Sequence, residues 1–156
     1  MSNILFVCTA NRCRSPMAER LFYHKLINLT PDRAENWMVG SAGTWATNNH
    51  KPDANLIASM ESYGIDIRDH RSRSLNDKMV TQQDLILVME NHHLEAMRFE
   101  YPDSAPKIFL LSQLIGNEFD IEDPFDKDLK DYQRAARLID EILSQGFSRI
   151  FQLAQD

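Results

Sequence analysis

Short apolar runs alternate along the chain with longer stretches in which apolar residues recur at helical spacing. The runs are strand-length and lie at 4–7, 37–39, 85–89 and 108–111, the second ending at Ser41-Ala42-Gly43. The helically spaced stretches lie at about 16–29, 53–63, 92–100 and 129–144, and this spacing predicts helices with one buried face. Strands that alternate with helices indicate a parallel sheet covered on both sides.

The expected fold is therefore α/β. We expect a single three-layer domain over residues 1–156, with a four-stranded parallel sheet in flavodoxin-like order. The continuous run at 85–89 suits a central strand that is buried on both faces. Ligands of such sheets bind at the carboxyl ends of the strands, where the strand order reverses. Cys8 follows the first apolar run, so it lies at such an end.

Composition and charge narrow the classes of function. The 156 residues are 43% apolar, which is enough for one core, and their net charge of −6 disfavours nonspecific binding to nucleic acid or an anionic membrane. No segment approaches the roughly 18 apolar residues of a membrane span, so no membrane insertion is expected. Both cysteines lie in one loop and are not spread as a disulfide scaffold. A reducing cytoplasm is the expected compartment.

Residues 8–15, read as Cys-Thr-Ala-Asn-Arg-Cys-Arg-Ser, connect the first strand to the first helix. Backbone N–H groups at a helix N-terminus point at a bound anion, and successive N–H groups in such a loop form an anion cradle. Arg14 adds a guanidinium that can clamp two phosphate oxygens. The same positive field favours the thiolate of Cys8, and a thiolate beside a bound phosphate is a nucleophile aimed at phosphorus. The alternative is a buried structural cysteine.

The pattern C-x5-R-S within VCTANRCRSPMAE resembles the low-molecular-weight protein tyrosine phosphatases, in particular their bacterial members. Later segments also match that family, namely Ser41-Ala42-Gly43-Thr44, the His70 region and Asp123-Pro124-Phe125. The resemblance spans nearly the whole chain. It implies hydrolysis of phosphotyrosine through a cysteinyl-phosphate, with phosphotyrosine proteins as partners and with no cofactor. Some bacterial members reverse tyrosine autokinases, so a kinase of that kind is an implied partner.

The resemblance also assigns residues to steps of the reaction. Cys8 is the expected nucleophile, Arg14 the phosphate clamp and Asp123 the general acid. From the residues alone the acid stays open, because five carboxylates crowd the segment 120–128. Ser15 can donate a hydrogen bond to the sulfur of Cys8, or it can be an ordinary serine at a helix start.

Further residues are expected to shape the pocket. Asn11 tolerates a positive φ, and in the family the matching asparagine is tied to residues that correspond to Ser41 and His70. The segment that binds phosphate and substrate is expected to comprise Thr9, Ala10, Asn11, Arg12, Cys13 and Ser15, with Trp45 and Phe125 as aromatic walls. Cys13 either forms a protective disulfide with Cys8, as the resemblance suggests, or only packs the loop. Arg12 either faces the cleft wall or pairs with a surface acid.

Other activities compete with phosphotyrosine hydrolysis. Protein arginine phosphatases look similar, and the Asp-Pro-Phe segment is shared with them, but they carry threonine where Arg12 stands. Thioredoxin-coupled arsenate reductases share the loop, yet they need later cysteines, and none follows Cys13. A silent phosphate-binding module would not need Cys8, Arg14 and Asp123 together. The pair His92-His93 invites a metal site, but we expect no metal because adjacent helical histidines should point apart and lack partners.

Overall fold

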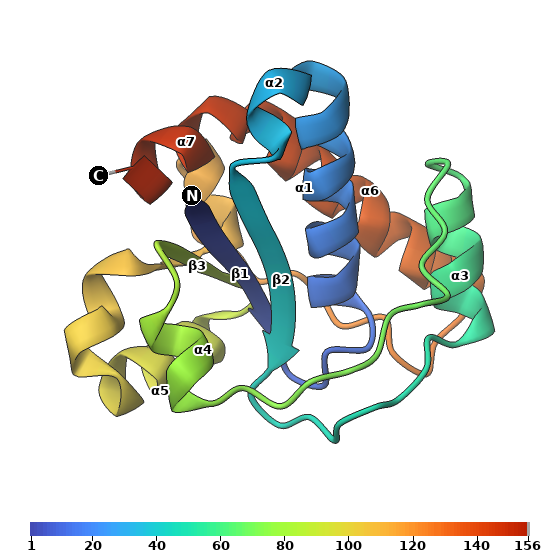
Figure 1. Ribbon diagram of the computed structural model, residues 1–156. Coiled ribbons are helices and arrows are strands. Elements are labelled where there is room, and N and C mark those ends of the chain that lie inside the picture. The colour runs from blue at the N-terminus through green and yellow to red at the C-terminus, as the bar shows by residue number, and fades with distance from the viewer. Residues whose placement is uncertain (156) are drawn as a thin grey trace.

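Four parallel strands form the central sheet of the structure, a computed structural model that describes residues 1–155 (Figure 1). The strands are β1 (Ser2–Cys8), β2 (Trp37–Gly43), β3 (Leu85–Val88) and β4 (Ile108–Leu110). Their order is β2-β1-β3-β4, and all three pairings are parallel. The predicted α/β fold with a four-stranded parallel sheet in flavodoxin-like order is therefore confirmed.

Helices cover both faces of this sheet. The long helices are α1 (Arg14–Leu29), α5 (Asn91–Glu100), α6 (Leu129–Gln145) and α7 (Phe147–Gln155). The shorter ones are α2 (Pro31–Ala34), α3 (Ala54–Glu61) and α4 (Asp77–Thr81), with 3-10 turns at Pro102–Lys107 and Leu111–Ile115. In Figure 1, α1, α6 and α7 lie on one side of the sheet and α4 and α5 on the other.

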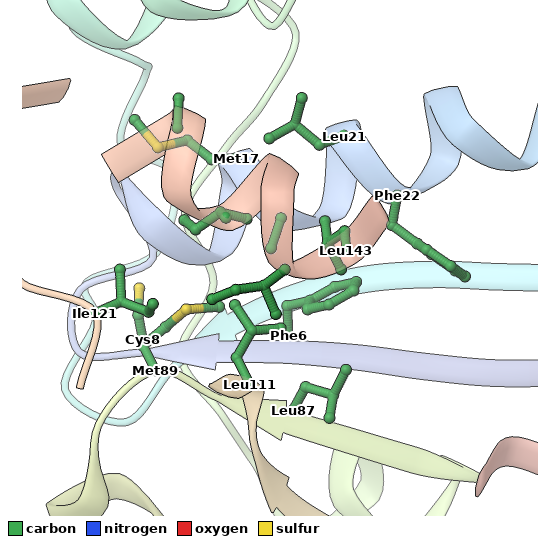
Figure 2. Close-up of a cluster of buried hydrophobic side chains, with 14 of the residues drawn as sticks. Phe6, Cys8, Met17, Leu21, Phe22, Leu87, Met89, Leu111, Ile121 and Leu143 are labelled. Carbon is green, nitrogen blue, oxygen red and sulfur yellow. The ribbon is translucent and has the colours of Figure 1, made fainter. Parts of the chain in front are cut away.

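Strand β1 supplies residues to both hydrophobic clusters. Ile4, Phe6 and Cys8 belong to the larger cluster, under α1 and α6, whereas Leu5 and Val7 belong to the smaller cluster on the α4 and α5 side. Successive side chains of a strand point to opposite faces, so the continuous apolar run fills both layers at once. Figure 2 shows Phe6 and Cys8 on the same face of β1, and this alternation places the Cys8 side chain at the end of the larger cluster.

The sequence pattern left several elements unpredicted, above all α7. This helix packs its aromatic residues onto the start of β2: Phe151 lies 5.0 Å from the ring of Trp37 and 5.1 Å from that of Phe147. Trp37 is buried in the core. Within residues 1–155, no helix combines the length and the apolar character that a membrane crossing requires.

Candidate active site

The loop between Cys8 and Ser15 lies where β1 ends and α1 begins. Asn11 has a φ of 56°, the left-handed conformation that asparagine tolerates better than most residues. The end of β2 presses against this loop: a Cβ atom on Gly43 would lie 2.4 Å from the carbonyl oxygen of Thr9 and 2.9 Å from the backbone nitrogen of Asn11. A glycine at the end of β2 therefore allows the loop its tight course.

Asn11 anchors the loop through both ends of its side chain. Its Nδ2 donates to Ser15 Oγ at 2.8 Å and to Ser41 Oγ at 2.9 Å, and its Oδ1 accepts from the backbone N–H of Arg73 at 2.9 Å. The carbonyl oxygen of Asn11 lies 3.0 Å from His70 Nε2. Burial lowers the pKa of His70, so the imidazole is neutral and donates Nε2–H. The structure thus brings Asn11, Ser41 and His70 together.

Ser15 is oriented toward the proposed nucleophile. Its hydroxyl oxygen accepts from Asn11 Nδ2, which leaves the hydroxyl proton for an acceptor of its own. Cys8 Sγ lies 2.9 Å from that oxygen, whereas the carbonyl oxygen of Ala42 is 3.4 Å away. The shorter separation favours a hydrogen bond to sulfur, and such a bond stabilises a thiolate at Cys8.

Arg14 is almost completely buried, with 1% of its surface exposed. Its Nη1 donates to the carbonyl oxygen of Ile121 at 2.7 Å and pairs with Glu90 Oε2 at 3.1 Å. Its Nη2 lies 3.5 Å from Asp123 Oδ2. Among residues 1–155, the buried Nε has no hydrogen-bond partner. One edge of the guanidinium is thus fixed by protein groups, while the Nε and Nη2 edge keeps donors for another ligand.

Asp123 stands on the irregular segment between Ile121 and α6. Its Oδ1 accepts the backbone N–H of Phe125 at 3.0 Å, and its side chain is 42% exposed. The pair with Arg14 brings this carboxylate to the phosphate loop although the two residues are far apart in sequence. A half-exposed carboxylate beside the buried clamp is suitably placed to exchange a proton with a bound ester.

Aromatic residues border the same region. The Arg12 guanidinium lies over the Phe125 ring, 5.0 Å from its centroid, so these two residues form one surface. The backbone N–H of Trp45 donates to the Thr9 carbonyl at 2.9 Å, but the Trp45 residue is 87% exposed. Trp45 therefore lies beside the loop with its indole open to solvent, and Ala10 lies half-buried within the loop.

Within the loop, Cys13 is a buried, free thiol, and Cys8 is free as well. Burial raises the pKa of the Cys13 thiol above its ordinary value. The Tyr132 hydroxyl donates to Asp53 Oδ2 at 2.7 Å, and Asp53 caps α3 through the N–H of Leu56. Cys13 is thus a buried neutral thiol, and the Tyr132–Asp53 hydrogen bond joins α6 to the start of α3.

Glu90 is a site residue that the sequence analysis missed. It follows β3, the strand beside β1, and contacts Arg14 Nη1. Burial acts to raise the pKa of Glu90, but Arg14 and the hydrogen bond from His92 outweigh it and leave that pKa below its ordinary value. Its position in the sequence, an acidic residue at the carboxyl end of a central strand, could have identified Glu90 as a candidate site residue.

One expectation about the histidine pair is wrong. The rings of His92 and His93 do not point apart: their centroids are 4.1 Å apart, and both Nε2 atoms lie within 4.0 Å of Glu90 Oε2. The N–H of Glu90 donates to His93 Nδ1 at 3.1 Å, so the neutral ring carries its proton on Nε2. A metal at Nε2 would require the opposite tautomer and the loss of this hydrogen bond, which argues against a metal site here.

A parallel sheet with an anion loop after its first strand, a buried arginine and a facing carboxylate is the arrangement of a phosphatase. The chain belongs to the low molecular weight phosphotyrosine protein phosphatase family, whose pattern matches residues 3–155. It is 32% identical over 150 residues to the probable low molecular weight protein-tyrosine-phosphatase EpsP of Ralstonia nicotianae, covering 96% of this chain and 97% of that protein.

Two further relatives define the range of activities in the family. The chain is 31% identical over 144 residues to the protein-arginine-phosphatase of Bacillus subtilis, covering 92% of this chain and 93% of the relative. The crystal structure of a low molecular weight protein tyrosine phosphatase from T. tengcongensis superposes with a TM-score of 0.87 at 34% identity, covering 96% of this chain and 99% of that one. Membership of the family therefore establishes a phosphatase, and it leaves tyrosine and arginine as candidate phosphoamino acids.

Proposed function

We propose that this phosphatase hydrolyses phosphotyrosine in proteins, without a metal, through a cysteinyl-phosphate intermediate. The Cys8 thiolate attacks phosphorus while the loop N–H groups and Arg14 neutralise the charge of the phosphate oxygens. Asp123 gives its proton to the leaving phenolate oxygen. The same carboxylate then takes a proton from the water that attacks the cysteinyl-phosphate, and phosphate is released.

The observation that carries this proposal is the unpartnered Nε of Arg14, beside an Nη2 whose contact with Asp123 is 3.5 Å long. A buried donor without a partner costs free energy, and here it belongs to a guanidinium fixed on its other side by Ile121 and Glu90. An oxyanion in the loop would accept from both Nε and Nη2, the two-pronged contact that guanidinium forms with phosphate. Lysine has a single ammonium and cannot reproduce it.

Tyrosine is favoured over arginine by the surface that Arg12 and Phe125 form together. The Phe125 ring suits a flat aryl ester, but the resemblance gives arginine phosphatases the same Asp-Pro-Phe segment, so Arg12 carries the distinction. A phosphorylated arginine brings a guanidino group with several N–H donors to the same place. The Arg12 guanidinium there has only N–H donors and a positive charge, so it cannot accept these hydrogen bonds and repels positive charge. The protein-arginine-phosphatase relative matches 92% of this chain, so overall similarity does not separate the two substrates, and we take Arg12 as the discriminating residue because the family resemblance implies threonine there in arginine phosphatases.

The test is hydrolysis of matched phosphotyrosine and phosphoarginine peptides in the presence of EDTA. We expect phosphotyrosine to be the better substrate by kcat/KM, with no loss on chelation. Cys8→Ser should abolish turnover while inorganic phosphate still binds, and Arg14→Lys should weaken both. Activity above a few per cent in Cys8→Ser would contradict the cysteinyl-phosphate mechanism.

Protein-arginine phosphatase is the second candidate, because a relative of that activity matches 92% of this chain. Arg12→Thr introduces the residue that we expect in such enzymes and removes the positive charge. If the surface formed by Arg12 and Phe125 excludes phosphoarginine, this variant should gain phosphoarginine hydrolysis, while Arg12→Lys, which keeps the charge, should not. A parent enzyme that already prefers phosphoarginine would reverse the assignment.

The protein substrate is expected to carry carboxylates near its phosphotyrosine, because Arg12 places positive charge beside Phe125 on an otherwise acidic protein. Arg12→Ile should remove a preference for acidic phosphopeptides and spare p-nitrophenyl phosphate. The preference should also weaken with salt. A bacterial tyrosine autokinase remains the expected partner, and dephosphorylation of such a kinase by the purified enzyme is the direct check.

A further inference from the structure

His93 has no place in the reaction described above, yet it contacts the phosphate loop. Its side chain is 1% exposed and lies in the first turn of α5. The Nδ1 atom accepts the backbone N–H of Glu90 at 3.1 Å, and Nε2 lies 2.8 Å from the hydroxyl oxygen of Thr9. Since Nδ1 is an acceptor, the neutral ring carries its proton on Nε2 and donates it to Thr9.

The surroundings of His93 keep the ring neutral. Burial first, and then the charges of His92 and Arg14, lower the pKa of His93 to about 4, while Glu90 and Asp120 act in the opposite direction. At neutral pH the imidazole is therefore a fixed donor. Its direction is set by the Glu90 N–H on one side and by Thr9 on the other.

Donation from His93 determines what the Thr9 hydroxyl can do. Thr9 Oγ1 accepts from His93, so its proton is free for a second partner. Within residues 1–155 Thr9 Oγ1 forms no other side-chain hydrogen bond. Thr9 directly follows Cys8, and its carbonyl is held by the Trp45 N–H, so the residue has little freedom to turn away from the loop.

We propose that His93 is a positioning residue that directs the Thr9 hydroxyl proton toward an oxygen of the phosphate bound in the loop. Thr9 is then a side-chain donor to the oxyanion beside the backbone N–H groups and Arg14. This inference rests on the proposed function only in assuming that phosphate occupies the loop. It applies to a phosphotyrosine and to a phosphoarginine substrate alike.

The experiment is a double-mutant cycle on Thr9 and His93, read out as the inhibition constant of inorganic phosphate against p-nitrophenyl phosphate. Thr9→Val keeps the shape and removes the hydroxyl, and His93→Asn keeps an acceptor at the Nδ1 position but does not reach Thr9. One hydrogen bond corresponds to a roughly 3–10-fold change in affinity. Each single variant should weaken phosphate binding by about that factor, and the double variant should be no weaker than the worse single one.

Conservative variants separate positioning from a structural effect. Thr9→Ser keeps the hydroxyl, and His93→Gln keeps a donor at the Nε2 position, so both should bind phosphate like the parent even if His93→Gln lowers the melting temperature. His24→Asn, a histidine change on α1 away from the loop, is the matched control. The melting temperature of every variant is measured alongside.

Each outcome bears on a separate claim. Unchanged phosphate inhibition in Thr9→Val, or effects that multiply in the double variant, would overturn the role of this pair. Weakened phosphate binding in His93→Gln equal to that in His93→Asn would also overturn it, because the donor would then be irrelevant. A parent protein that neither binds phosphate nor hydrolyses any aryl phosphate would instead contradict the proposed function.

Discussion

Replacing Gly43 by alanine is expected to disable the site although Gly43 is not itself one of the residues proposed to bind phosphate. The added Cβ would lie 2.4 Å from the Thr9 carbonyl oxygen, 2.8 Å from the Ala46 Cβ and 2.9 Å from the Asn11 nitrogen. Two of these neighbours are backbone atoms of the phosphate loop. They cannot rotate aside, so the loop itself or the end of β2 has to move.

The size of the displacement follows from the contact distances. Cβ atoms essentially never approach other heavy atoms closer than 3.0 Å, so a separation of 2.4 Å requires about 0.6 Å of movement at Thr9. Overpacking of this kind costs about 1–3 kcal/mol of stability. A misplacement of about 1 Å in a catalytic geometry can cost about 10²-fold in rate. We therefore expect kcat/KM to fall by at least about 10-fold.

The assay is hydrolysis of p-nitrophenyl phosphate together with the melting temperature, and Gly40→Ala is the matched control. Gly40 lies on the same strand, but its added Cβ would meet a side-chain atom at 3.0 Å, Arg73 Nη2, which donates to the Ser41 carbonyl and would have to give by only a few tenths of an ångström. Gly40→Ala should keep kcat/KM within about twofold, because that guanidinium can shift. If Gly43→Ala retained kcat/KM to the same degree, the close approach of β2 would not control the loop.

Three further results are expected. Asp123→Asn should slow phenyl phosphate far more than p-nitrophenyl phosphate, because the better leaving group needs less protonation; equal losses would indicate a structural role. Peroxide should inactivate the enzyme through a Cys8–Cys13 disulfide that thiol reductants reverse. Because burial raises the pKa of the Cys13 thiol, that disulfide should form faster as pH rises. If peptide mapping finds no Cys8–Cys13 link after oxidation, Cys13 only packs the loop. His93 has a pKa of about 4 in the folded protein against about 6.5 unfolded, so it takes up a proton first in the unfolded state. The parent should lose up to about 3 kcal/mol of stability between pH 6.5 and 4 that His93→Gln retains, as urea unfolding at both pH values measures.

The main strands and helices could be predicted from the sequence because each kind of element needs its own periodicity of apolar residues to bury a face. The runs at Ile4–Val7 and Leu85–Val88 are continuous because both faces of the sheet are covered. Helix α7 was not predicted because its aromatic residues are partly buried by packing on Trp37, which lies more than a hundred residues earlier in the chain. Local periodicity carries no information about such a partner.

The loop from Cys8 to Ser15 could also be predicted as an anion site, because an anion cradle is made from consecutive residues at a strand end and a helix start. The tertiary structure alone decided which distant groups complete it. Glu90 reaches Arg14 because β3 lies beside β1, and Asp123 among its acidic neighbours is the carboxylate placed near the guanidinium. The sequence by itself thus determined the fold class and the phosphate loop. Only the folded chain decided the partners of Arg14, because a contact between separate strands depends on their order in the sheet and not on their spacing in the chain.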